Sequence, residues 1–191
     1  MHKLLFFASG SGTNFQSVID AVESGRVNAS ICGLITDRLG AGAIQRARKH
    51  SIPVHTIFSK DNDQFTTELL SALEDLSPDL IILAGYLRKI PDRIINLYRG
   101  RIINIHPSLL PKYGGKGFYG QNVHHAVIEN GESWSGCTVH FVDEIYDNGA
   151  IIAQKKVRVK ADDTPETLAK KILKEEHKLL PDTIKHLLTQ K

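Results

Sequence analysis

The stretch Leu4-Leu5-Phe6-Phe7-Ala8-Ser9-Gly10-Ser11-Gly12-Thr13-Asn14-Phe15 joins an apolar run to a glycine-containing turn and then to a stretch with helical spacing. A short apolar run that ends in a turn is typical of a strand buried on both faces. Glycines let the backbone bend tightly there, and the free amide groups at a helix start can bind a phosphate. The segment therefore predicts a strand, a turn and a helix, with an anion site between strand and helix.

The same alternation continues through the first half of the chain. Four further apolar runs are rich in Leu, Ile and Val and read as strands, at residues 31–36, 54–57, 80–84 and 102–105. Stretches with helical spacing lie between the strands, at residues 15–24, 42–50, 64–76 and 91–98. This order predicts an α/β fold with a mostly parallel central sheet and helices on both faces.

The second half has a different rhythm. Residues 137–142 and 151–159 read as strands, and the turn-rich segment 143–149 between them is too short for a crossover helix, so an antiparallel pair is expected. Asp163-Thr164-Pro165-Glu166 opens a last helix with either Asp163 or Thr164 as its cap. Pro181 is expected to kink or divide that helix.

Composition sets the class of protein. The 191 residues carry 24 Lys and Arg against 21 Asp and Glu, a net charge of +3 without blocks of like charge, which favours small anions over nucleic acid as ligands. Cys32 and Cys137 lie outside any metal-binding spacing, and His124 and His125 have no third ligand placed by the sequence, so no metal is expected. The first apolar run is too short for a signal peptide, and no stretch reaches membrane-spanning length. We expect a soluble, cytoplasmic protein without a nucleic-acid or membrane partner.

Residues 9–14 suit a phosphate better than a dinucleotide. The loop lacks the Gly-Lys-Ser/Thr ending of a nucleotide-binding P-loop, and Phe15 stands where the dinucleotide fingerprint has its third glycine. Binding of a phosphomonoester fits better than binding of NAD. The alternative is a tight turn without a ligand.

A second candidate for chemistry is Asn104-Ile105-His106-Pro107-Ser108-Leu109-Leu110-Pro111, which ends the fifth strand. Alternation along a strand puts Asn104 and His106 on one side, at the carboxyl edge where open α/β sheets bind ligands. An amide donor beside an imidazole can stabilise an oxyanion and move a proton. A lone histidine at a strand end is more often structural, but the neighbouring asparagine and two prolines favour a catalytic role.

A third candidate lies between the last two strands. Thr138, His140 and Val142 share a strand face, and the acidic turn that follows can bring a carboxylate towards His106. Acidic residues in a turn are usually solvated turn formers. Nothing within this segment selects Asp147 over Asp143 or Glu144.

Taken together, these motifs resemble the phosphoribosylglycinamide formyltransferases, a folate-dependent formyltransferase family of purine synthesis. Residues 10–14 are similar to the family's phosphate loop, Leu83-Ala84-Gly85-Tyr86-Leu87-Arg88 to its folate-contacting strand end, and residues 104–111 to its catalytic signature. The resemblance implies a Rossmann-like formyltransferase fold in one domain over residues 1–191, with a phosphate-binding half (1–100) and a catalytic half (101–191). It also implies 10-formyltetrahydrofolate as co-substrate and glycinamide ribonucleotide as acceptor.

The resemblance assigns roles to individual residues. It selects Asp147, because the interval from His140 to Asp147 matches the family's spacing. The implied catalytic residues are Asn104, His106 and Asp147. The implied acceptor-binding residues are Gly10, Ser11, Gly12, Thr13, Asn14 and Glu176, the last holding the ribose hydroxyls. The implied folate-binding residues are Leu87, Arg88, Lys89, Ile90, Asn104 and His140.

The chain also departs from the family pattern. The glycine-rich segment 114–120 is longer and is expected to be a mobile lid. Asn62 stands where some members carry a basic residue for the folate tail. Methionyl-tRNA formyltransferase and formyltetrahydrofolate hydrolase share the catalytic signature, but the early phosphate loop and the expected absence of a further domain favour glycinamide ribonucleotide as acceptor. A non-catalytic phosphate sensor is the remaining alternative, and we expect a monomer or weak homodimer.

Overall fold

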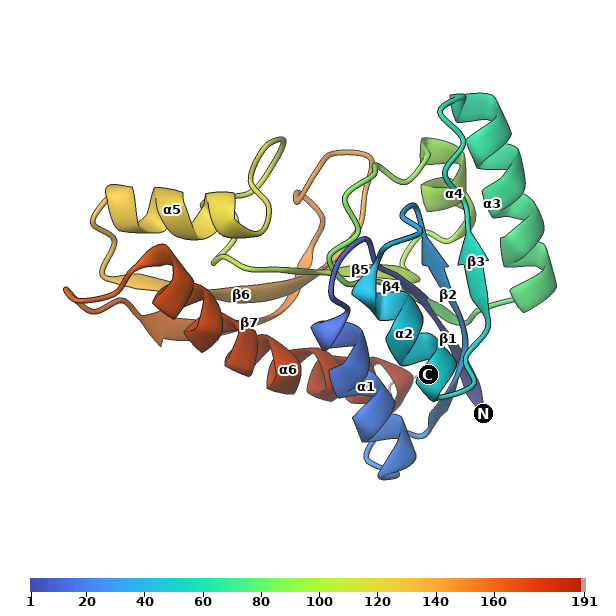
Figure 1. The fold of residues 1–191 in the computed structure, drawn as a ribbon, viewed down its shortest axis with the longest axis horizontal. Helices are drawn as coiled ribbons and strands as arrows, with labels where there is room; N and C mark the ends of the chain where they lie inside the picture. The colour runs from blue at the N-terminus through green and yellow to red at the C-terminus, as the bar shows by residue number, and fades with distance from the viewer. Residues whose placement is uncertain (190–191) are drawn as a thin grey trace.

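One sheet forms the centre of the molecule, which is described by a computed structural model over residues 1–189. Its strands follow the order β3-β2-β1-β4-β5-β6-β7 (Figure 1). Strands β1 to β5 are parallel to one another, and β6 runs antiparallel to both β5 and β7. The strands are β1 (His2–Phe7), β2 (Ala29–Thr36), β3 (Val54–Thr56), β4 (Leu80–Leu83), β5 (Ile102–His106), β6 (Trp134–Phe141) and β7 (Ile151–Arg158).

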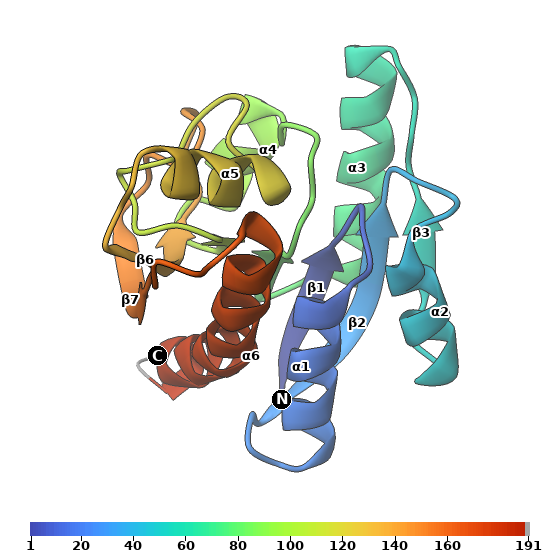
Figure 2. The same cartoon turned by 60° about the vertical axis from the view of Figure 1, so that its left-hand side comes forward.

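Helices cover both faces of the sheet (Figure 2). Helices α1, α2, α5 and α6 contribute to one apolar cluster, whereas α3 and α4 contribute to the other. The helices are α1 (Thr13–Glu23), α2 (Gly42–Lys49), α3 (Asn62–Leu76), α4 (Asp92–Leu97), α5 (Gln121–Glu129) and α6 (Pro165–Thr189).

The alternation of side chains along β1 explains why its sequence is apolar throughout. Leu4 and Phe6 point into the α1 side, and Leu5 and Phe7 point into the α3 side. All four side chains are fully buried. A strand that packs against helices on both faces cannot carry polar residues without a cost in free energy. The α/β architecture predicted from these runs is confirmed.

The second half differs from the prediction in three places. Strand β6 begins at Trp134 rather than residue 137, and its pairing with both neighbours extends the expected antiparallel pair to three strands. Helix α5 was not expected, because its apolar positions are interrupted by His124 and His125. Pro181 was expected to kink or divide the last helix; it does not divide it, because α6 continues through Pro181, which is buried. Packing of this helix against α1 and α5 outweighs the hydrogen bond that proline removes.

The strand order changes direction at β1 and β4, which lie side by side in the sheet. Strands β2 and β3 extend the sheet on one side of β1, and β4 and β5 extend it on the other. Ligands of open α/β sheets bind at such a switch point, outside the carboxyl ends of the strands. The backbone amide of Ser9 donates to the carbonyl of Gly85 over 3.0 Å, so the loops after β1 and β4 meet there.

Candidate active site

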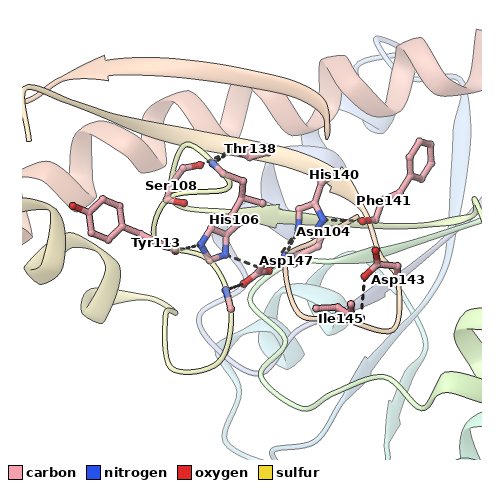
Figure 3. A network of polar contacts seen from close by, with 12 residues as sticks. Asn104, His106, Ser108, Tyr113, Thr138, His140, Phe141, Asp143, Ile145 and Asp147 are labelled. Carbon is pink, nitrogen blue, oxygen red and sulfur yellow. Dashed lines mark hydrogen bonds and ion pairs between the residues drawn. The ribbon is translucent and has the colours of Figure 1, made fainter. Parts of the chain in front are cut away.

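Two neighbouring strands bring the central polar side chains together. Asn104 of β5 pairs with His140 of β6, and His106 pairs with Thr138. The ring of His106 is 5% exposed and that of His140 is 2% exposed, so both lie beneath the surface. Figure 3 shows Asn104, His106 and His140 converging on one carboxylate, that of Asp147.

Asp147 reaches this cluster from the turn between β6 and β7. Its Oδ1 atom lies 3.5 Å from His106 Nδ1 and 3.6 Å from His140 Nε2. Its Oδ2 atom accepts a hydrogen bond of 2.9 Å from the backbone amide of Gly115. The backbone of Asp147 has a φ of 54°, in the left-handed region that asparagine and aspartate adopt more readily than most residues.

The other two acids of this turn have different partners. Asp143 accepts from the amide of Ile145 over 2.9 Å and from Asn148 over 3.1 Å, which stabilises the turn itself. Glu144 forms an ion pair with Arg99. The structure therefore separates the three candidates that the segment's sequence alone left open, and places Asp147 beside His106.

Hydrogen bonding fixes the orientation of Asn104. His140 Nδ1 lies 2.8 Å from the carbonyl of Phe141, to which it donates. Because an amide nitrogen can only donate, His140 Nε2 accepts from Asn104 Nδ2 over 3.1 Å. The second amide hydrogen of Asn104 faces Asp147 Oδ1 at 3.5 Å. That long contact leaves a donor able to bind a negatively charged oxygen.

At both His106 and Asp147, burial and polar contacts shift the side-chain pKa in opposite directions. Burial lowers the pKa of His106, while the Asp147 carboxylate and the Tyr113 carbonyl act in the raising direction. Burial has the larger effect, so the pKa of His106 in the ligand-free protein lies below its usual value. Burial alone would raise the pKa of Asp147, but its contacts with His140, His106 and Gly115 outweigh burial and lower it. Asp147 is thus a carboxylate.

Two cavities adjoin at this cluster. A larger one of about 450 Å³ is lined by Gly10, His106 and the glycine-rich segment 115–120. A smaller one of about 80 Å³ is lined by Ile90, His140 and other residues at the ends of β4 and β6. Asn104 and Asp147 line both, together with Tyr86 and Tyr146. A group in one cavity can therefore react with a group in the other beside Asn104 and Asp147.

The predicted phosphate loop lies as expected between β1 and α1. Gly12 precedes the first helical residue with a φ of 71°, and a Cβ atom there would lie 2.7 Å from the Cβ atom of Ala43, so the position requires glycine. Gly10 lines the larger cavity, whereas residues 11–14 do not. Asn14 donates to Glu176 over 2.6 Å, which joins the first helix to the last. The Oδ1 atom of Asn14 is buried without a partner among residues 1–189.

The predicted folate-binding residues are divided between the two cavities: Leu87 lines the larger one, and the other five line the smaller one. The smaller cavity is lined by Arg88, Lys89 and Ile90, and the Leu87 amide donates to the Ser9 hydroxyl over 3.1 Å. The guanidinium of Arg88 stacks on Phe65 and donates to the Ser59 carbonyl and to Asn62. Asn62 is therefore one of three residues that contact the Arg88 guanidinium.

Several lining residues were not singled out by the sequence. Tyr146 adjoins Asp147 in the chain, which was a usable signal, and Tyr86 lies within the quoted strand end. The backbone groups of Tyr113 and Gly115 contact the cluster without any signal in residue type.

Within residues 1–189 no group of three or more His, Cys, Asp or Glu side chains is placed to hold a metal ion. The helices of the described chain include none with the length and apolar character needed to cross a bilayer.

Comparison with known proteins gives a consistent result. The sequence model of a family described as "Formyl transferase" matches residues 2–184. The chain is 44% identical over 187 residues to the chloroplastic phosphoribosylglycinamide formyltransferase of Arabidopsis thaliana, covering 95% of this chain and 64% of the plant protein. It is 39% identical over 191 residues to the phosphoribosylglycinamide formyltransferase of Bacillus subtilis, covering 98% of this chain and 95% of that protein. The chain thus spans just under two thirds of the plant relative and nearly all of the bacterial one.

A solved structure has the same fold. The crystal structure of glycinamide ribonucleotide transformylase 1 from Geobacillus kaustophilus superposes with a TM-score of 0.91 at 39% identity. The match covers 98% of this chain and 99% of that chain.

Proposed function

Because the chain belongs to the formyl transferase family, we propose that it transfers the formyl group of 10-formyltetrahydrofolate to the amine of glycinamide ribonucleotide. The products are formylglycinamide ribonucleotide and tetrahydrofolate, in de novo purine synthesis. The observation that carries the proposal is the junction of two cavities at Asn104 and Asp147. The identity of relatives named for this activity supports the choice of acceptor.

The proposed chemistry needs no enzyme nucleophile. The amine of the acceptor attacks the formyl carbon, and the carbonyl oxygen becomes an oxyanion in a tetrahedral intermediate. Asn104 Nδ2 donates to that oxygen with the hydrogen that faces Asp147 in the free protein. His106 Nε2 is bound to the Tyr113 carbonyl, so Nδ1, 3.5 Å from Asp147, is the ring nitrogen that acts there.

Asp147 and His106 respond to the negative charge that forms on the carbonyl oxygen during this step. The oxyanion adds negative charge beside His106, which favours the imidazolium form against the effect of burial. Asp147 stabilises the cation and assists, through water, the transfer of a proton from the attacking amine to the folate nitrogen. When the carbonyl re-forms, the bond between the formyl carbon and that nitrogen breaks and tetrahydrofolate leaves.

The acceptor's phosphate provides a test of the proposal. Glycinamide riboside, which lacks the phosphate, is expected to be a very poor substrate compared with the ribonucleotide. Formation of the formylated product from each, measured with the purified protein, checks this. Equal kcat/KM values would remove the assignment of residues 10–14 to phosphate binding.

Gly10→Ala isolates the approach of a ligand to this loop. A Cβ atom at Gly10 meets no atom within 4 Å, so the fold tolerates it, but it projects from a residue that lines the larger cavity. We expect the KM for the acceptor to rise roughly tenfold, because a phosphate loses part of its contact with the backbone amides. Steady-state kinetics with each substrate varied in turn measure the effect.

Gly40→Ala is the matched control, since a Cβ atom there also meets open space and Gly40 does not line the cavity. It should leave both KM values unchanged. A Gly10→Ala effect confined to the KM for folate would mean that the two sites are reversed.

Glu176→Gln separates binding from stability. Burial raises the pKa of Glu176, whereas the hydrogen bond from Asn14 lowers it to a smaller extent. A raised pKa in the folded state favours folding at low pH, and that contribution is lost as the pH rises through it. A glutamine side chain does not titrate, so the variant does not lose stability in this way, and its side-chain oxygen can still accept from Asn14. The melting temperature of the variant relative to wild type should therefore increase between about pH 5 and about pH 8.

The same variant should raise the KM for glycinamide ribonucleotide if Glu176 holds the ribose hydroxyls. Glu175→Gln, at the half-buried neighbouring position paired with Lys178, is the control for both measurements. If the melting temperature of Glu176→Gln relative to wild type falls at the higher pH and the KM is unchanged, neither the effect on stability nor the contact with the ribose hydroxyls is supported.

The cytoplasmic location, the monomer or weak homodimer, the division into halves and the absence of a nucleic-acid partner stay predictions. The mobile lid at residues 114–120 also stays a prediction.

A further inference from the structure

A short segment after β5 contacts both predicted catalytic side chains. The backbone carbonyl of Tyr113 accepts from His106 Nε2 over 2.7 Å, and the backbone amide of Gly115 donates to Asp147 over 2.9 Å. Figure 3 shows His106 between the Tyr113 carbonyl on one side and Asp147 on the other. The orientation of the imidazole therefore depends on where residues 113–115 lie.

The backbone of this segment has to be held in place. Tyr113 has a φ of 55°, in the left-handed region that costs free energy for a residue with a Cβ atom. The hydroxyl of Ser108 donates to the carbonyl of Lys112 over 2.6 Å, which closes the turn from inside. Such a conformation persists only when surrounding contacts stabilise it.

Glu132 supplies the outer contacts. Its Oε1 atom accepts from the hydroxyl of Tyr113 over 3.1 Å and from Lys112 Nζ over 2.8 Å. Glu132 lies just before β6, so it ties the segment to the strand that carries His140. One carboxylate oxygen therefore binds two consecutive side chains of the segment.

We propose that Glu132 is a positioning residue, which binds Lys112 and Tyr113 and thereby holds the Tyr113 carbonyl that orients His106. The role rests on the proposed function. An exposed Lys–Glu pair by itself contributes little to stability. Glu132 differs because the residues it binds lead directly to the backbone carbonyl on His106.

Loss of the Glu132 contact is expected to change the pKa of His106. The charged or titratable groups that face the ring are Asp147, His140 and His124, with the Tyr113 carbonyl as a further acceptor. The Tyr113 carbonyl favours the protonated ring. Moving it away removes that support and leaves the three side chains in place, so the pKa of His106 should fall.

The test compares Glu132→Ala and Glu132→Gln with Glu175→Gln in the full chain. Glutamine keeps an acceptor oxygen for the Tyr113 hydroxyl, whereas alanine keeps none. The control pair has nearly the same geometry: Glu175 and Lys178 are 2.8 Å apart with side-chain exposures of 23% and 67%, against 2.8 Å, 24% and 67% for Glu132 and Lys112. The measurements are kcat, both KM values, and the pKa of His106 from NMR of the ring.

We expect Glu132→Ala to lower kcat about tenfold with both KM values little changed, because a small misplacement of a catalytic group slows the reaction more than it weakens binding. The pKa of His106 should fall in the same variant. Glu132→Gln should lie between Glu132→Ala and wild type in both readouts, and Glu175→Gln should match wild type.

An unchanged pKa of His106 in folded Glu132→Ala would overturn the proposal, and so would loss of melting temperature with kcat and pKa preserved. If Glu132→Ala fails to fold, Tyr113→Phe removes the hydroxyl contact alone, and an unchanged pKa there is equally contrary. The NMR readout needs no substrate. Failure of wild type to formylate glycinamide ribonucleotide therefore contradicts the proposed function without deciding the role of Glu132.

Discussion

Asp147→Asn is expected to lower turnover by a hundredfold or more while both KM values change little. Asparagine tolerates the left-handed backbone at this position, so the turn keeps its shape and the charge is removed. Without the carboxylate, burial acts on His106 with less opposition and its pKa falls further below the usual value. Turnover measured at saturation with both substrates, and NMR titration of the His106 ring, check the two parts.

Asp143→Asn is the matched control for this variant. Asp143 belongs to the same turn, but its carboxylate binds Ile145 and Asn148 rather than the histidines. It should keep nearly full turnover, and the pKa of His106 should be unchanged. If the two variants keep similar activity, or if Asp143→Asn is the slower one, the role assigned to Asp147 is wrong.

Asn104→Ala is the second large expected loss, again about a hundredfold in turnover. Asn104 is held by His140 with one amide hydrogen and has the other, long contact to Asp147 available for an oxyanion. Because that donor acts on charge that develops during the reaction, its removal should lower kcat and kcat/KM for the acceptor equally. Initial rates over a range of acceptor concentrations measure both.

Asn96→Ala removes an exposed asparagine that binds Arg99 and serves as the control. It should leave both kinetic parameters unchanged. A rise in the acceptor KM for Asn104→Ala, with kcat preserved, would mean that Asn104 binds substrate and does not stabilise the transition state.

The fold could be predicted from the sequence because buried strands and amphipathic helices differ in period. The runs 4–8 and 80–84 are apolar at every position, since both of their faces pack against helices. The side on which Asn104 and His106 lie followed from the same alternation. Helix α5 was not predicted because two histidines interrupt its apolar stripe, although His124 is buried together with the apolar residues.

The site could be predicted only in part. Residue type and alternation indicated Asn104 and His106, but three acids shared one turn, and selecting Asp147 needed a resemblance to other proteins. The contact between Asn14 and Glu176 joins residues 162 positions apart, a pairing that no local pattern contains. The carbonyl of Tyr113 on His106 is a backbone group that every residue type carries, so its role depends on conformation alone.

The most direct test of the central claim is the consumption of 10-formyltetrahydrofolate by the purified protein with and without glycinamide ribonucleotide. The two adjoining cavities predict consumption that depends on the acceptor, with one formylated ribonucleotide formed for each tetrahydrofolate released. Consumption at the same rate without the acceptor, with formate as product, would show a hydrolase and contradict formyl transfer to an amine.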